Sequence, residues 1–222
     1  MDTDLAGRRA MVVGAEFDAG GAIALALAEA GADVAVCALQ PDESVLRSRK
    51  VKRAIEALGH RSAEYVMDVM LGRNVQVTTR QVAKEMGGLD LVVSTGELPL
   101  AAPLDKISET DLARIVALNF SAHLFVLRSA VSEFGRNEER GGSRGRVLLV
   151  TRDRAGEPGM AAVAGAQSGA LQLVHEAARE FAESSILVNG LKLAGDADVE
   201  AIRAAALDLV VRAVTGEVIE VA

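Results

Sequence analysis

Short runs of aliphatic and β-branched residues alternate with longer stretches of helical periodicity along the whole chain. A buried strand is expected at residues 9–14, and a helix follows it at 20–30. This alternation predicts right-handed βαβ crossovers, and hence an α/β fold with one doubly wound parallel sheet of about seven strands and helices on both faces. The remaining strands are expected at 33–38, 63–67, 89–94, 146–151, 186–189 and 217–221, and the remaining helices at 44–58, 73–86, 108–134, 160–182 and 197–212.

The composition sets the size and the make-up of the core. Of the 222 residues 50% are hydrophobic but only 3% are aromatic. The core is therefore expected to consist of Ala, Val, Leu and Ile side chains, as in helices packed on a parallel sheet. Because a chain of this length buries one core without needing a second, residues 1–222 are predicted to form a single domain.

Charge and cysteine content argue against several classes of function. The net charge of −7 argues against a nucleic-acid partner, because phosphate neutralisation needs a clustered basic surface. The one basic run, Arg47–Arg53, reads as the solvated face of a helix, with a phosphate-contacting patch as the alternative. The lone Cys37 cannot form an intrachain disulfide, and no sequence cluster offers the ligands of a structural metal.

The N-terminus predicts no targeting. Met1–Asp4 is polar and acidic and lacks the pattern of a signal peptide, and no apolar run is expected to reach membrane-spanning length. The expectation is a cytoplasmic protein with no membrane partner.

A glycine-rich segment follows the first expected strand. Residues 13–23 read VGAEFDAGGAI, and glycines in such a segment let the N–H groups of a helix N-terminus approach a pyrophosphate. The segment and its flanks resemble the TGxxxGxG loop of short-chain dehydrogenases/reductases, with Gly14 and Gly20 at the outer glycine positions. The resemblance implies a Rossmann-type domain and NAD or NADP as the cofactor.

Asp18 replaces the middle glycine of that loop. Its Cβ would lie where the backbone has to pass close to phosphate. Its carboxylate would repel each phosphate charge about 4 Å away by roughly 1 kcal/mol in water, and by more in a partly dry site. We therefore expect no bound cofactor. The alternative is a tolerated loop variant with Asp18 turned toward solvent.

The other cofactor positions of the family are lost or ambiguous. Residues 37–40 read CALQ, which offers neither an Asp for ribose hydroxyls nor a basic residue for a 2′-phosphate. Asp68 resembles the family's adenine-contacting Asp, and residues 93–96 line up with its NNAG turn, of which only Gly96 remains. Asp68 can equally be a turn or cap residue, and Gly96 a position of positive φ. The vestigial cofactor contacts in this interpretation are Gly14, Gly20, Asp68 and Gly96.

Reductases of this family resemble one another in four catalytic residues. A Tyr acts as general acid or base, a Lys lowers its pKa, a Ser orients the substrate oxygen and an Asn positions a water relay. Asn119 matches the Asn, but Val163 stands at the Tyr position and Gln167 at the Lys position. An aliphatic side chain and a neutral amide supply neither the proton nor the charge. The Ser position falls at one of three consecutive residues, Thr151, Arg152 or Asp153.

The number of tyrosines independently supports the loss of the family's proton-transfer residues. The chain has one Tyr, Tyr65 in the third expected strand, so no Tyr-x-x-x-Lys pair can exist. His123 and His175, on the two long helices, are the alternative acid/base groups. After residue 190 the family's long substrate-closing insertion is also missing, so the lid that would exclude water is shortened.

A scaffold that keeps its fold without its chemistry still offers surfaces. The resemblance spans essentially the whole chain and implies an oligomer built through the helices at 108–134 and 160–182. The second helix carries small residues at 161–170, which allow close helix packing with a partner or, alternatively, only within the monomer.

The resulting hypothesis is a pseudoenzyme subunit. It would assemble with and support a catalytically active short-chain alcohol or hydroxyacyl-CoA dehydrogenase, as the inactive subunit of a heteromeric enzyme. Two alternatives remain open: an atypical NAD(P)-dependent oxidoreductase with a non-standard acid/base, and a nucleotide or metabolite sensor.

Overall fold

Seven parallel strands form a single sheet in the computed structural model, which describes residues 5–140 and 142–222. Their order is β3-β2-β1-β4-β5-β6-β7. This order confirms the predicted doubly wound α/β fold. The segment Met1–Asp4, for which no targeting was predicted, lies outside the described residues. The strands are β1 (Arg9–Val13), β2 (Asp33–Ala38), β3 (Ser62–Val66), β4 (Leu91–Ser94), β5 (Gly145–Arg152), β6 (Ile186–Leu193) and β7 (Val218–Val221).

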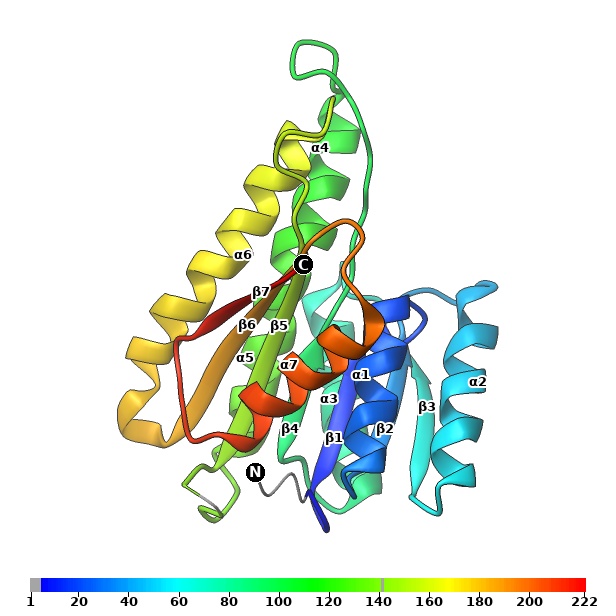
Figure 1. Ribbon diagram of the computed structural model, residues 1–222, viewed down its shortest axis with the longest axis vertical. Coiled ribbons are helices and arrows are strands. Elements are labelled where there is room, and N and C mark those ends of the chain that lie inside the picture. Colours follow the sequence, from blue (N-terminus) through cyan, green and yellow to red (C-terminus); the bar gives the residue numbers. More distant parts are fainter. Residues whose placement is uncertain (1–4, 141) are drawn as a thin grey trace.

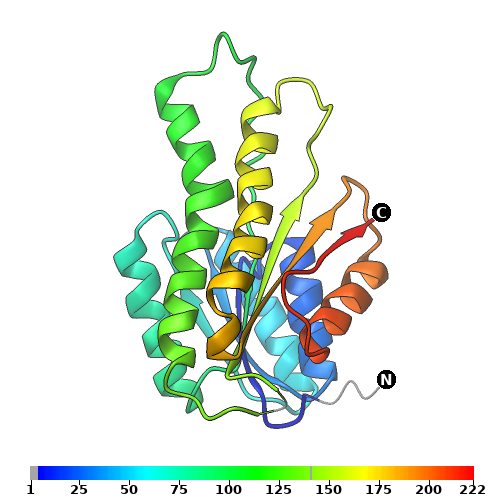
Figure 2. The ribbon, with the colours of Figure 1, turned by 90° about the vertical axis from the view of Figure 1, so that its left-hand side faces the viewer.

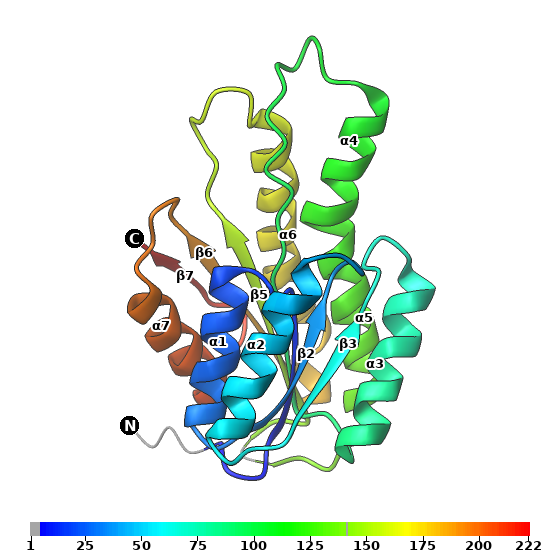
Figure 3. The ribbon, with the colours of Figure 1, turned by 90° about the vertical axis from the view of Figure 1, so that its right-hand side faces the viewer.

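Helices cover both faces of this sheet (Figures 1 and 3). The helices α1, α2 and α7 lie on one face, and α3, α5 and α6 lie on the other. The helical segments are α1 (Asp18–Glu29), α2 (Ser44–Ala57), α3 (Gly72–Met86), α4 (Glu109–Val116), the π-helical η1 (Ala117–Ser121), α5 (Ala122–Phe134), α6 (Ala161–Glu180), the 3-10 turn η2 (Ala182–Ser184) and α7 (Val199–Val211).

The core is divided by the sheet into two clusters. Along β1, Met11 and Val13 face one cluster, whereas Ala10 and Val12 face the other, because successive side chains of a strand point to opposite faces. Both clusters consist almost wholly of aliphatic side chains, as the composition predicted, with Phe134 as the one fully buried aromatic ring among them.

The predicted helix at 108–134 is interrupted by the π-helical turn η1. Its start is as expected, since the Ser108 hydroxyl accepts the N–H of Asp111 across 3.0 Å. At the interruption, the Asn119 side chain donates to the backbone carbonyl of Ile115 across 2.9 Å. A side chain that donates a hydrogen bond to a carbonyl of its own helix competes with the backbone N–H for that carbonyl, which favours a π-helical turn. Hydrophobic periodicity did not predict this turn.

The same helical stretch corrects one sequence expectation. Over its 26 residues, Glu109–Phe134 is long and apolar enough to span a membrane by length and composition, with a mean hydropathy of 1.4 in its most apolar window. Half of that window is buried within the protein, and apolar side chains of α5 in it pack into the hydrophobic core on that face of the sheet.

The helix pair formed by α4–η1–α5 and α6 runs side by side and extends past the end of the sheet (Figure 2). β6 is longer than the expected 186–189, because Gly190 to Leu193 pair with β7. It ends at Leu193 and α7 begins at Val199, which leaves residues 194–198 as the whole connection.

Candidate functional site

The loops after β1 and β4 meet at the switch point of the sheet, where its carboxyl edge forms a crevice. The Thr95 hydroxyl donates to the carbonyls of Val13 and Gly14, at 3.1 and 3.0 Å. A Cβ on Gly14 would lie 2.4 Å from the Thr95 carbonyl oxygen, and one on Gly20 would lie 2.1 Å from the Gly14 carbonyl oxygen. Contacts within the chain therefore require both glycines, whether or not a phosphate binds.

Asp18 is the first residue of α1 and is exposed. No side chain caps this helix, since its N-cap residue is Phe17. The carboxylate of Asp18 stands in the first turn, where a negative charge complements the helix dipole. The place at which a pyrophosphate would be stabilised thus already carries an anion.

A groove of about 200 Å³ opens beside Asp18. Arg152 lines this groove and connects three backbone or side-chain groups around it. Its guanidinium donates to the carbonyls of Ala194 and Gly195 at 2.9 and 2.7 Å, and it lies 3.7 Å from the Glu97 carboxylate. Arg154 makes a second ion pair with Glu97. The groove is lined by Phe17, Asp18, Ala19, Thr95, Gly96, Glu97, Val150, Thr151, Arg152 and Leu193.

The three residues expected around the Ser position have separate roles. Arg152 makes the contacts just described. Asp153 forms an ion pair with Lys192 at 2.8 Å. Thr151 borders the groove, and its buried hydroxyl has no hydrogen-bond partner among the described residues. Of these three residues, Thr151 is therefore the one that places a hydroxyl group beside the groove, where the family's Ser is expected.

A second groove, of about 420 Å³, adjoins the first on the side of β2. Glu16 is 7% exposed; its Oε1 accepts the Leu39 N–H across 2.8 Å, and its Oε2 has no partner in the described part of the chain. Burial raises the pKa of this carboxyl group. Asp42, Glu43 and Glu97 also line the groove, and Arg47 is its one lining cation. This acidic lining opposes a 2′-phosphate.

Sequence reasoning missed Glu16. A glutamate inside the glycine loop is the signal that was available. Its partner Leu39 lies 23 positions away, so the contact itself had no local signature.

The positions of the family's Tyr, Lys and Asn come together in a buried cluster. Val163 and Asn119 are fully buried and Gln167 is 4% exposed. Gln167 donates to Asn119 Oδ1 across 3.4 Å. Asn119 also donates to Leu98 O and accepts the Leu98 N–H, so it joins the loop after β4 to η1. In this cluster the two amide side chains bond to each other and to backbone groups.

The other candidate acid/base groups lie elsewhere. His123 is 1% exposed and its Nδ1 lies 3.0 Å from the Ser94 hydroxyl; burial lowers its pKa to about 4. His175 contacts the Gly216 carbonyl, ahead of β7. Tyr65, in the edge strand β3, donates to Glu85, and burial together with that hydrogen bond raises its pKa. None of the three lines either groove.

Asp68 and Gly96 have structural roles. Asp68 Oδ1 accepts the Met70 N–H across 3.0 Å, and the Asp68 N–H donates to Asn74, which is the hydrogen bonding of a turn. Gly96 has φ +151°, and a Cβ there would lie 3.1 Å from Leu39.

A dinucleotide fits this crevice poorly. It would have to pass Phe17, which borders both grooves, and its pyrophosphate would meet the carboxylate of Asp18 with Glu97 close by. The Asp18 carboxylate would repel a pyrophosphate bound beside it, whereas the charge of Glu97 is offset by its ion pairs with Arg152 and Arg154. Among residues 5–140 and 142–222, no group of three or more His, Cys, Asp or Glu side chains is placed to hold a metal.

The parallel sheet with its glycine loop at the switch point defines a Rossmann-type architecture. A family model described as short chain dehydrogenase matches residues 8–200, and the chain belongs to this family. It is 30% identical to a hydroxynaphthalene reductase of Aspergillus fumigatus over 193 residues, which covers 86% of this chain and 67% of that protein.

Two further similarities agree with this assignment. A short-chain dehydrogenase/reductase of Armillaria gallica is 32% identical over 185 residues, 82% of this chain and 69% of the relative. The structure of a short chain dehydrogenase from Burkholderia cenocepacia in complex with NADP superposes with a TM-score of 0.86 at 24% identity, covering 98% of this chain and 97% of that one. At this identity the likeness concerns the fold.

Proposed function

We propose that this chain is a non-catalytic short-chain dehydrogenase, which serves as a subunit beside a catalytically complete relative. The observation that carries the proposal is the buried cluster of Val163, Gln167 and Asn119. Proton transfer needs an ionisable group within reach of the substrate, and this cluster contains none.

The charges of the crevice support the absence of a cofactor. Asp18 borders the groove at the N-terminus of α1, and Arg152 is tied to two carbonyls and to Glu97 rather than free to bind an anion. The isolated chain is therefore expected to bind neither NAD nor NADP in calorimetric titration. Micromolar affinity for either nucleotide would contradict this part of the proposal.

The projecting helices support a role as a subunit. Leu112, Val116 and Leu124 are 42%, 40% and 37% exposed on α4 and α5. On the neighbouring α6, Gly165 is exposed and a Cβ there would meet open space. Apolar and small side chains on two adjacent helices suit a helix-to-helix interface with a related chain.

The structure also selects the variant that tests this interface. A Cβ on Gly169 would lie 3.3 Å from Phe120, so a large side chain there would disturb the monomer itself. Gly165→Trp adds bulk on the open side of α6. Leu58→Trp, on the exposed end of α2 in the opposite layer, is the matched control.

The experiment is co-expression with catalytically complete short-chain dehydrogenases from the same genome, followed by light scattering. The proposal expects a mixed oligomer that Gly165→Trp breaks and Leu58→Trp preserves. A monomer that ignores such a relative would contradict it.

Family membership supports a second candidate, an atypical NAD(P)-dependent oxidoreductase, because the relatives above are named as reductases and one solved neighbour holds NADP. Turnover of a nicotinamide cofactor by the isolated chain, above a heat-inactivated control, would favour this candidate. Nucleotide binding without turnover would instead favour a sensor.

A further inference from the structure

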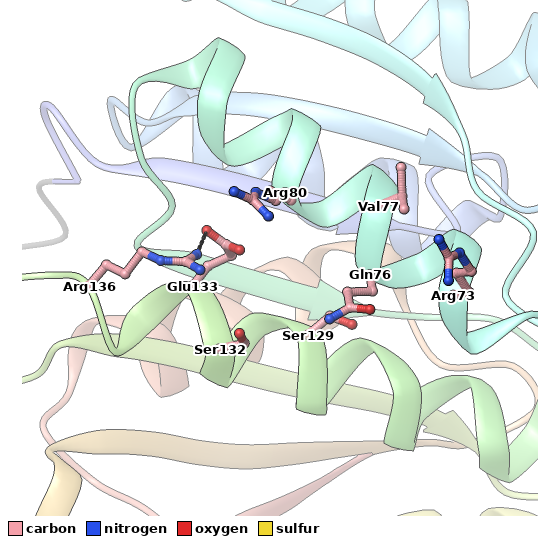
Figure 4. Close-up of a pocket in the computed structure, with 8 residues that line it drawn as sticks. All are labelled: Arg73, Gln76, Val77, Arg80, Ser129, Ser132, Glu133 and Arg136. Carbon is pink, nitrogen blue, oxygen red and sulfur yellow. Dashed lines mark ion pairs between the residues drawn. The ribbon is translucent and has the colours of Figure 1, made fainter.

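A separate hollow of about 230 Å³ lies between α3 and α5 (Figure 4). It shares no lining residue with the two grooves of the crevice. We call it the α3–α5 groove. It is lined by Arg73, Gln76, Val77, Arg80, Ser129, Ser132, Glu133 and Arg136.

Cations dominate this lining. Arg73 and Arg80 stand seven positions apart on α3, which places both on one side of the helix about 10 Å apart along its axis. Neither guanidinium has an ion pair or a side-chain hydrogen bond within the described ranges. Arg136 pairs with Glu133, the one carboxylate present. Arg80 and Arg136 both extend toward Glu133, and Arg73 lies at the other end (Figure 4).

A buried hydroxyl lies at the floor of the groove. Ser129 is 4% exposed, and its Oγ has no hydrogen-bond partner among the described atoms. Gln76 extends from α3 toward it (Figure 4). A buried polar atom without a partner costs free energy, so a ligand that accepts its proton would recover that cost.

The positive surface continues beyond the groove. A neighbouring hollow of about 440 Å³ shares Arg80, Glu133 and Arg136 with it and adds Lys84. The Lys84 ammonium has no ion pair in the described part of the chain. In a protein with a net charge of −7, unpaired cations gathered at one hollow indicate an anionic ligand.

We propose that the α3–α5 groove binds a phosphoryl group, either as free phosphate or as the head of a small phosphomonoester. Three guanidinium groups against one carboxylate leave an excess of positive charge that a phosphoryl dianion matches better than a single carboxylate does. The planar fork of Arg80 suits bidentate binding to phosphate oxygens. The Ser129 hydroxyl supplies a donor from the floor.

The test measures binding of inorganic phosphate and of glycerol phosphate by calorimetry, at constant ionic strength maintained with sodium chloride. The proposal expects saturable binding that Arg80→Gln and Arg73→Gln each weaken roughly tenfold or more. Arg53→Gln, which removes an exposed arginine from α2 on the opposite face, is the charge-matched control and should leave the affinity unchanged.

Two further results decide the proposal. Ser129→Ala should weaken phosphate binding while leaving the unliganded protein at least as stable, because the substitution removes an unsatisfied buried hydroxyl. Binding of glycerol phosphate as well as phosphate identifies a phosphomonoester site, whereas binding of inorganic phosphate alone identifies free phosphate. Two results would overturn the proposal. One is that chloride binds in the same titration as tightly as phosphate does. The other is that Arg53→Gln and Arg80→Gln lower the affinity for phosphate equally.

Discussion

Gln167 donates its side-chain N–H to Asn119 Oδ1 across 3.4 Å, which links α6 to the π-helical turn η1 inside the protein. Gln167 is 4% exposed and its own Oε1 has no partner among the described residues. The position at which the family's catalytic lysine is expected therefore holds a neutral amide, in surroundings with no place for a charge.

Gln167→Lys should destabilise the protein. The hydrogen-bond partner of Gln167 among the described residues is the neutral amide of Asn119, so an ammonium group here would gain no counter-ion from it, and an uncompensated buried charge costs about 3–5 kcal/mol. Urea unfolding at pH 7 measures the loss. Gln172→Lys, on the exposed side of the same helix, should change the free energy of unfolding by no more than about 0.5 kcal/mol. Equal stability of both variants would show that the cluster admits a cation, in favour of the oxidoreductase candidate.

His123 should make stability fall with acid. Its pKa is about 4 in the folded protein, against an ordinary value of 6.5, so the unfolded chain binds its proton first. The stability contributed by neutral His123 is complete above pH 6.5 and is lost as the pH falls toward 4, by about 3 kcal/mol in total.

Urea unfolding between pH 4 and 7 tests this expectation. His123→Gln should flatten the pH dependence relative to the wild type, because glutamine does not titrate. His175→Gln, at a half-buried position, is the matched control. A His123→Gln curve parallel to the wild type would contradict the assigned pKa.

Gly14→Ala should be far more costly than a glycine substitution elsewhere. Gly14 has φ +86°, and its Cβ would lie 2.4 Å from the Thr95 carbonyl oxygen, so strain and overpacking together cost about 3 kcal/mol or more. Gly165→Ala, in a helix and with open space around the new methyl group, should stabilise by roughly 0.5–1 kcal/mol. Thermal unfolding of both variants measures the difference.

Glu16→Gln should stabilise the protein at neutral pH. Burial raises the pKa of Glu16 in the folded state, so the ionised carboxylate opposes folding above that pKa and does not below the ordinary value of 4.5. The amide oxygen can still accept the Leu39 N–H. The urea midpoint should rise at pH 7 and approach the wild-type value at pH 4. Glu43→Gln, at an exposed position, is the matched control.

The order of strands and helices was predictable because the two periodicities report local backbone geometry and burial. β2 begins at Asp33 and ends at Ala38 as expected, and most other elements begin or end within a few residues of their predicted bounds. The absence of a Tyr–Lys pair was equally certain, since one tyrosine in the whole chain leaves no alternative register. What periodicity could not show was the π-helical turn at Asn119, which depends on a side chain bonding to its own helix.

Only the tertiary structure decided which distant polar groups meet. Arg152 reaches the carbonyl of Ala194 from 42 positions away, and the arginines of the α3–α5 groove come from α3 and from the turn that follows α5. Each of these side chains reads as an ordinary surface charge in its own segment, because hydrophobic periodicity records which side of an element is buried and not which element lies opposite. That choice follows from the crossover connections of the sheet, which bring α3 and α5 together and place the ends of β4, β5 and β6 at one edge.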